Sequence, residues 1–158
     1  MKQYKTALFI GRFQPLHKGH VYSLKKCVEM AEHVVVGIGS SQEKGTENNP
    51  WDYETRKEMI TSVMGDSVTV VAIPDNLSDA VWLHNLLKIV GQFDVVVSNN
   101  NWVLSIMKEA GYQTYETGLY NRDELEGVKI RKLMRAGDTG YQKRLPRTIV
   151  AMVATSAL

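Results

Sequence analysis

Two histidines, His17 and His20, lie three residues apart in a short segment that also holds Arg12 and Lys18. The segment, residues 11–20, follows an apolar run of strand composition and precedes a helical pattern. At such a junction the unpaired backbone N–H groups and the helix dipole favour an anion, so phosphate oxygens are the expected ligands. Imidazoles and cations gathered there would spread the negative charge of a phosphoryl group during its transfer. The residue types and their spacing therefore indicate phosphoryl-transfer chemistry.

Other interpretations of the two histidines stay open at this point. A lone histidine is more often a surface or capping residue, but a pair around Gly19 at a strand-to-helix turn favours a functional role. A zinc site is a weaker alternative, because no Cys, Asp or third His stands nearby in sequence to complete a tetrahedral set. A covalent histidine nucleophile is a further alternative, which we rank below direct transfer.

The elements that must position these residues follow an α/β pattern. Short β-branched runs alternate with longer helical patterns, as in βαβ units whose parallel sheet is covered on both faces. We expect five strands, at residues 7–10, 34–38, 68–73, 93–97 and 112–115. We expect helices at about 20–32, 53–64, 79–90, 102–110 and 125–136, and a last helix with Pro146 at its first position. The pattern predicts one Rossmann-like doubly wound domain over residues 1–158.

In such a fold, ligands bind beyond the carboxyl ends of the strands, where the chain order reverses. The same loops should therefore carry the function. They are residues 11–20, 39–52, 74–82 and 98–101, with the basic stretch 121–135 as a fifth candidate.

Composition excludes several classes of protein. The formal net charge is only +2, which is too small an excess for a dedicated nucleic-acid binder. Cys27 is the only cysteine, so no intramolecular disulfide can form; its helical spacing from Leu24 and Val28 predicts core packing. No apolar stretch approaches the roughly 18 residues of a membrane span, so we expect no membrane partner and a cytoplasmic protein.

Common nucleotide-binding motifs do not match. The chain has no G-x-x-x-x-G-K-[ST], and residues 37–42 lack the third glycine of the dinucleotide fingerprint. Instead, the HxGH pattern at residues 17–20 resembles the nucleotidyltransferase superfamily, and GRFQP at residues 11–15 resembles the archaeal-type nicotinamide mononucleotide (NMN) adenylyltransferases. The resemblance continues through residues 37–42, 49–50, Arg56, 73–75, 80–82, Ser98, Asn100 and 121–122.

This resemblance implies transfer of AMP from ATP to NMN, giving NAD and pyrophosphate without a covalent enzyme intermediate. By the same resemblance, the catalytic residues would be Arg12, His17, His20 and Arg131. ATP would also contact Gly11, Phe13, Lys18, Gly19, Asn121, Gly127, Lys129 and Ile130. NMN would contact Gly39, Ser40, Asp75, Trp82 and Asn100. Mg²⁺ would be held largely by nucleotide oxygens and water, and a homo-oligomer, commonly a hexamer in the family, is implied.

The residues themselves admit plainer explanations. Trp82 is also compatible with a half-buried helix residue, Asp75 with a helix cap, and Arg131 and Arg135, four apart on one helix face, with a solvated surface. The chain also departs from the family pattern Ser-Gly-Thr-x-x-Arg, because Glu126 and Val128 replace both hydroxyl residues.

Two alternative functions stay open, and the departure at Glu126 and Val128 motivates the second of them. One is nucleotidyl transfer to another phosphorylated acceptor: nicotinic acid mononucleotide, FMN or phosphopantetheine. The other is a nucleotide-sensing module of weak catalytic power, since a fold alone does not define an activity.

Overall fold

The computed structural model describes residues 1–118, 125–156 and 158. Its centre is one sheet of five parallel strands in the order β3-β2-β1-β4-β5. The strands are β1 (Tyr4–Gly11), β2 (Ala31–Ile38), β3 (Thr69–Ala72), β4 (Val95–Val97) and β5 (Gln113–Tyr115). The predicted fold class is confirmed, and each expected strand is present.

Six α-helices connect and flank the described strands. They are α1 (Lys18–Met30), α2 (Tyr53–Met64), α3 (Asp79–Val90), α4 (Asn101–Glu109), α5 (Gly127–Arg135) and α6 (Arg147–Val153). Two short 3₁₀ helices, η1 (Gly65–Ser67) and η2 (Thr139–Arg144), complete the described elements.

The observed boundaries of the strands and helices differ from the predicted ones by up to three residues, and two of the differences have a clear physical cause. The first helix ends at Met30 rather than near residue 32, because Ala31 already pairs with Tyr4 in the β1–β2 ladder and is buried. Pro146 is not the first helical residue but the cap before it, with an extended ψ of 149°. Its carbonyl accepts the N–H groups of Ile149 and Val150, so the helix starts one residue later than predicted.

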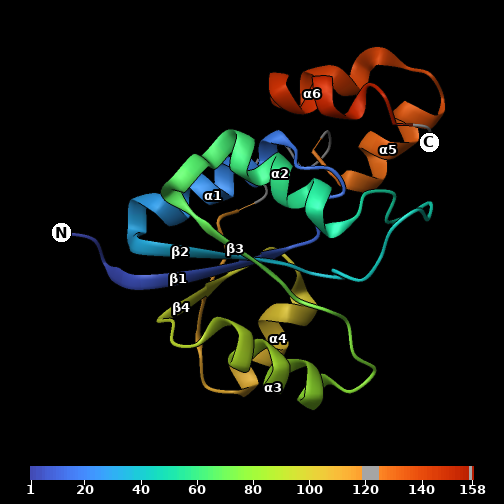
Figure 1. The fold of residues 1–158 in the computed structure, drawn as a ribbon. Coiled ribbons are helices and arrows are strands. Elements are labelled where there is room, and N and C mark those ends of the chain that lie inside the picture. Colours follow the sequence, from blue (N-terminus) through green and yellow to red (C-terminus); the bar gives the residue numbers. More distant parts are fainter. Residues whose placement is uncertain (119–124, 157) are drawn as a thin grey trace.

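Helices cover both faces of the sheet, with α1 and α2 on one side and α3 and α4 on the other (Figure 1). Successive β1 residues alternate between the two cores: Ala7 and Phe9 join the larger cluster, and Leu8 and Ile10 join the smaller one. A strand buried on both faces needs apolar residues at every position, which explains its unbroken apolar run. Cys27 is fully buried in the larger cluster, as predicted.

The strand order creates the crevice in which a ligand can bind. Strand β1 lies between β2 and β4, so the chain proceeds outward from β1 in one direction and then crosses over to β4 in the other. Connections after β1 and β4 therefore diverge to opposite faces and leave a gap at their carboxyl ends. Among the described residues, no helix is long and apolar enough to cross a membrane.

Candidate active site

A cavity of about 790 Å³ lies at the carboxyl ends of the strands. Its walls come from the connections after β1, β2, β3 and β4 and from the first turn of α5, so the predicted loops do meet. Most of the predicted site residues line it, namely Gly11, Arg12, Phe13, His17, Gly19, His20, Gly39, Ser40, Asp75, Trp82, Asn100, Gly127 and Arg131.

Three predicted ATP contacts are not part of the cavity wall. Lys18 is exposed at the start of α1. Lys129 pairs with Glu126 at 3.7 Å, and the side chain of Ile130 is fully buried in the larger core cluster. Asn121 lies outside the described residues. The helical periodicity explains the first result, because Lys18 projects away from the face that carries His17.

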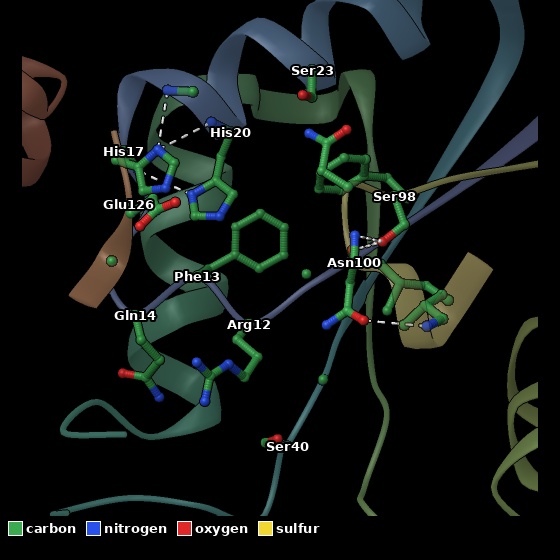
Figure 2. A pocket seen from close by; sticks show the side chains of 18 of the residues that line it. Arg12, Phe13, Gln14, His17, His20, Ser23, Ser40, Ser98, Asn100 and Glu126 are labelled. Carbon is green, nitrogen blue, oxygen red and sulfur yellow. Dashed lines mark hydrogen bonds between the residues drawn. The ribbon is translucent and has the colours of Figure 1, made fainter. Parts of the chain in front are cut away.

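The two histidines hold each other in place at the start of α1 (Figure 2). Nδ1 of His17 accepts the backbone N–H groups of Gly19 and His20 at 3.0 and 3.3 Å. In return, Nδ1 of His20 accepts the backbone N–H of His17 at 3.1 Å. The two rings stack with centroids 3.7 Å apart. This reciprocal arrangement is a capping box in which imidazoles replace the usual hydroxyl and carboxylate.

The capping box determines which nitrogen of each ring carries the proton. A neutral imidazole has one donor and one acceptor nitrogen, and in both rings Nδ1 already accepts. Nε2 of His17 and of His20 must therefore carry the hydrogen. The cavity wall thus includes two adjacent N–H donors in a known tautomer.

Burial keeps both imidazoles neutral at pH 7. It lowers the pKa of His17 from 6.5 to about 4, although the carboxylate of Glu126 acts in the opposite direction. Burial also lowers the pKa of His20 well below its ordinary value, and His17 lowers it further. Neutral imidazoles in this tautomer can act as hydrogen-bond donors toward the cavity.

Gly19 is required by the neighbouring ring rather than by the cavity itself. A Cβ at this position would lie 2.9 Å from Cε1 and 3.0 Å from Nδ1 of His17. Any side chain at residue 19 would therefore push the His17 ring out of the capping box.

Phe13 forms the wall between the histidines and β1. Its ring lies 4.7 Å from that of His20, and its side chain is almost completely buried. Its φ of 55° is in the left-handed region, which is uncommon for an aromatic residue. Gly11 allows this conformation, since a Cβ there would approach the Phe13 ring to 3.1 Å.

Arg131 reaches the cavity from α5 and is 2% exposed, so the solvated-face interpretation is wrong for it. Its Nη1 donates to the carbonyl of Gln14 at 2.6 Å, while its buried Nε has no partner among the described residues. Gly127 leaves room for it, because a Cβ there would lie 2.8 Å from Nη1. Arg135, one turn later, is exposed and pairs with Glu47 instead.

The guanidinium groups of Arg12 and Arg131 make the cavity attractive to anions. Burial lowers the pKa of Arg131, and the positive charge of Arg12 lowers it further. Two like charges that repel each other across a cavity wall are both stabilised when an anion binds between them. A phosphate with several acidic oxygens suits this requirement.

Helix α5 begins without a side-chain cap. Glu126 stands at the N-cap position but accepts no hydrogen bond from the first turn, and Val128 is 57% exposed. The carboxylate of Glu126 lies beside the two imidazoles (Figure 2). The side chain of Glu126 therefore does not cap this helix start, and its carboxylate places a negative charge on this part of the cavity wall.

Arg56 is a positioning residue to which the resemblance assigned no role. It is fully buried on α2 and donates to the carbonyls of Arg12, Gly39 and Ser40 at 3.0, 2.9 and 3.1 Å. These bonds tie the connection after β1 to that after β2. The match at residue 56 was the only sequence signal for it.

Asp75, which follows β3, also holds the connection after β2. It accepts hydrogen bonds from Ser40 at 3.1 Å and from Gln42 at 2.9 Å. The capping interpretation of Asp75 is wrong, because the cap of α3 is Ser78. Asn100 caps α4 instead, and it contacts Ser98, whose side chain lies on the cavity wall.

Comparison with known proteins places this site in a class. Residues 8–132 match the cytidylyltransferase-like family, and the chain belongs to that family.

Relatives of this chain carry a more specific name than that of the family. Nicotinamide-nucleotide adenylyltransferase from Ignicoccus hospitalis is 33% identical over 153 residues, covering 93% of this chain and 90% of the relative. The protein of the same name from Archaeoglobus fulgidus is 31% identical, covering 93% of this chain and 89% of its own. The relatives thus match along nearly their whole length.

Solved structures share the fold. The crystal structure of a bifunctional NMN adenylyltransferase/ADP ribose pyrophosphatase from Francisella tularensis superposes with a TM-score of 0.78 at 20% identity. The superposition covers 97% of this chain and 50% of that one, so this chain spans about half of the bifunctional protein.

Proposed function

We propose that this chain is a nicotinamide-nucleotide adenylyltransferase, which joins ATP and NMN into NAD and releases pyrophosphate. The observation that carries the proposal is the pair of Nε2–H donors on His17 and His20, opposite Arg131, in a cavity at the switch point of the sheet. The names of the archaeal relatives support the choice of substrates.

In the proposed reaction an oxygen of the NMN phosphate attacks the α-phosphorus of ATP, and the bond from that phosphorus to the bridging oxygen of pyrophosphate breaks. His17 and His20 donate hydrogen bonds to phosphate oxygens without changing their own charge. Arg12 and Arg131 neutralise the charge that accumulates where the two substrates meet. Such transfer gains mainly from alignment and electrostatic stabilisation, so no protein nucleophile is required.

We further propose that Mg²⁺ acts with the triphosphate, where it supplies charge neutralisation of the departing pyrophosphate. A magnesium site built from the protein alone would need several oxygen ligands such as carboxylates, which Mg²⁺ prefers. The described residues hold no group of three or more side chains suited to bind a metal by themselves. The nucleotide oxygens are therefore proposed to supply most of the ligands.

The test is incubation of the protein with ATP, Mg²⁺ and one mononucleotide at a time, with the products identified by mass. NMN should give NAD and pyrophosphate in equal amounts. The proposal would be rejected if no NAD formed in the reaction with NMN. If an adenylylated product formed only from nicotinic acid mononucleotide, FMN or phosphopantetheine, the enzyme would instead transfer AMP to that acceptor.

One observation favours a second candidate, a nucleotide-sensing module. Glu126 and Val128 leave the first turn of α5 without hydroxyl donors and add a negative charge. Calorimetry that found tight NAD binding, together with no pyrophosphate release, would support this function instead. The implied homo-oligomer also remains a prediction, which analytical ultracentrifugation can test.

A further inference from the structure

The side chain of Gln14 joins the loop that carries the histidines to the loop that follows β2. Its Oε1 accepts the backbone N–H of Trp51 at 3.0 Å, and its Nε2 donates to the carbonyl of the same residue at 2.8 Å. A backbone N–H can only donate and a carbonyl can only accept, so the two bonds fix the orientation of the amide. We call this pair of hydrogen bonds the Gln14 clamp.

Trp51 is a firm point of attachment for the clamp. Its side chain is only 6% exposed and packs in the larger core cluster. Its indole Nε1 also donates to the hydroxyl of Ser156 at 2.9 Å. A shift of the Trp51 backbone would disturb both contacts, so the amide of Gln14 is held by a part of the chain that is itself buried and bonded.

The backbone carbonyl of Gln14 in turn holds Arg131. Nη1 of Arg131 donates to this carbonyl at 2.6 Å, and a Cβ on Gly127 would lie only 3.2 Å from it. The part of the chain that the structure describes gives the guanidinium no other hydrogen bond, and its Nε is buried without a partner there. The direction in which the guanidinium points therefore depends on the position of this one carbonyl.

Direct contact between the Gln14 side chain and a substrate is the alternative, because Gln14 belongs to the cavity wall. Its burial argues against that role. The residue is 3% exposed, and both polar atoms of its amide are bonded to Trp51. The side chain also points away from the two histidines (Figure 2). The amide therefore acts inside the protein rather than in the cavity.

We propose that Gln14 is a positioning residue: its clamp on Trp51 places the carbonyl that orients Arg131 toward the phosphates of ATP. This inference rests on the proposed function and concerns the ATP half of the same cavity. The clamp requires one donor and one acceptor at the same end of the side chain, which glutamine supplies. Methionine has a similar length and volume but makes neither bond, so it releases the carbonyl without leaving a large cavity.

The experiment measures the Kd of ATP and the Kd of NMN separately by calorimetry, for the wild type and for Gln14→Met. The Kd for ATP should rise about five- to tenfold, because a charged hydrogen-bond donor to phosphate is misaligned. The Kd for NMN should change by less than about twofold. In turnover, KM for ATP should rise with the Kd, while kcat stays within about threefold of the wild type. Gln92→Met, which replaces an exposed glutamine outside the cavity wall, is the matched control and should bind both ligands as the wild type does.

A double-variant cycle distinguishes positioning from a merely structural role. In an Arg131→Met background there is no guanidinium to orient, so Gln14→Met should change the Kd for ATP by less than about twofold. Its effect on thermal unfolding should be present in both backgrounds. The proposal would be overturned by a Kd for ATP that is unchanged in Gln14→Met, or that rises by the same factor in both backgrounds.

A second variant covers the case in which Gln14→Met does not fold. Gln14→Glu then enters the same cycle, because its ionised carboxylate keeps an acceptor for the Trp51 N–H but has no donor for the Trp51 carbonyl. An increase in the Kd for ATP that disappears in the Arg131→Met background would support the proposal, and an equal increase in both backgrounds would overturn it. Wild-type protein that binds ATP but forms no NAD would instead reject the proposed function alone, since ATP binding still reports the effect of Gln14.

Discussion

Two helix starts face the same cavity, and they are built in opposite ways. At the start of α1, the capping box of His17 and His20 uses both Nδ1 atoms within the protein and leaves both Nε2–H groups as donors. At the start of α5, the side chain of Glu126 makes no capping hydrogen bond to the first turn. The first turn is thus capped by its own side chains, whereas the second carries a carboxylate at the cap position that does not make this hydrogen bond.

The two helix starts differ in how far their hydrogen-bond donors are oriented by the protein before a ligand binds. Donors that are already oriented cost no reorganisation when charge develops, so the α1 turn is suited to the transition state. The α5 turn carries Arg131 but also the opposing carboxylate of Glu126, so it is suited to adjusting how strongly the triphosphate binds. Changes at α1 should therefore affect turnover, and changes at α5 should affect ATP affinity.

The largest effect is expected from His20→Ala. Loss of one transition-state donor should lower kcat by about 10²–10³-fold with a small change in KM for ATP, measured as pyrophosphate release. Lys25→Ala, an exposed substitution on the same helix, should retain wild-type kcat. If His20→Ala had the same kcat as the wild type, His20 would not be a transition-state donor, and the role assigned to the α1 turn would be wrong.

Acid should destabilise the protein through the same histidines. The folded-state pKa of His17, about 4, lies below the ordinary 6.5, so the unfolded chain binds protons first. Stability is therefore full above pH 6.5 and falls as the pH drops toward 4, by about 3 kcal/mol for this residue. Urea unfolding at several pH values measures this.

His17→Asn removes that titration but keeps a good capping side chain. Its free energy of unfolding should fall less between pH 7 and pH 4 than that of the wild type. Leu77→Asn, a substitution at an exposed position whose side chain does not titrate, should keep the wild-type pH dependence. Identical slopes for His17→Asn and wild type would contradict a buried neutral His17.

Gly19→Ala should disturb the α1 turn by displacing the His17 ring. We expect a stability loss of about 1–2 kcal/mol and a kcat about tenfold lower, since the new methyl overpacks a tight contact. In a His17→Ala background the same substitution should add almost nothing, because the clashing ring is gone. A full additive loss in the double variant would show that the glycine serves another purpose.

The smallest effect is expected at α5. Glu126→Gln removes a negative charge beside the triphosphate and should lower KM for ATP about threefold with kcat nearly unchanged, an advantage that salt should reduce. Glu58→Gln, an exposed carboxylate on α2, is the control. A higher KM in Glu126→Gln would show that the carboxylate assists binding, as a Mg²⁺ ligand would.

The alternation of strands and helices could be predicted from the sequence, because a sheet buried on both faces needs unbroken apolar runs such as residues 7–10. The loop 11–20 was identifiable because its glycines, histidines and cations are adjacent along the chain. These properties depend on local spacing and local propensity, and the amino-acid order alone determines them.

Other features depend on distance in space between residues far apart in sequence. Arg56 reaches three carbonyls of two loops, Arg131 is buried against Gln14, and Trp102 covers Trp82, each through contacts that no local pattern encodes. The neutral, single-tautomer state of His17 likewise arises from burial and from bonds closed by folding. The sequence by itself determined the order of strands and helices and the loop 11–20 in which candidate phosphate ligands are adjacent. Only the tertiary structure decided their protonation, their burial and their neighbours, because those depend on packing.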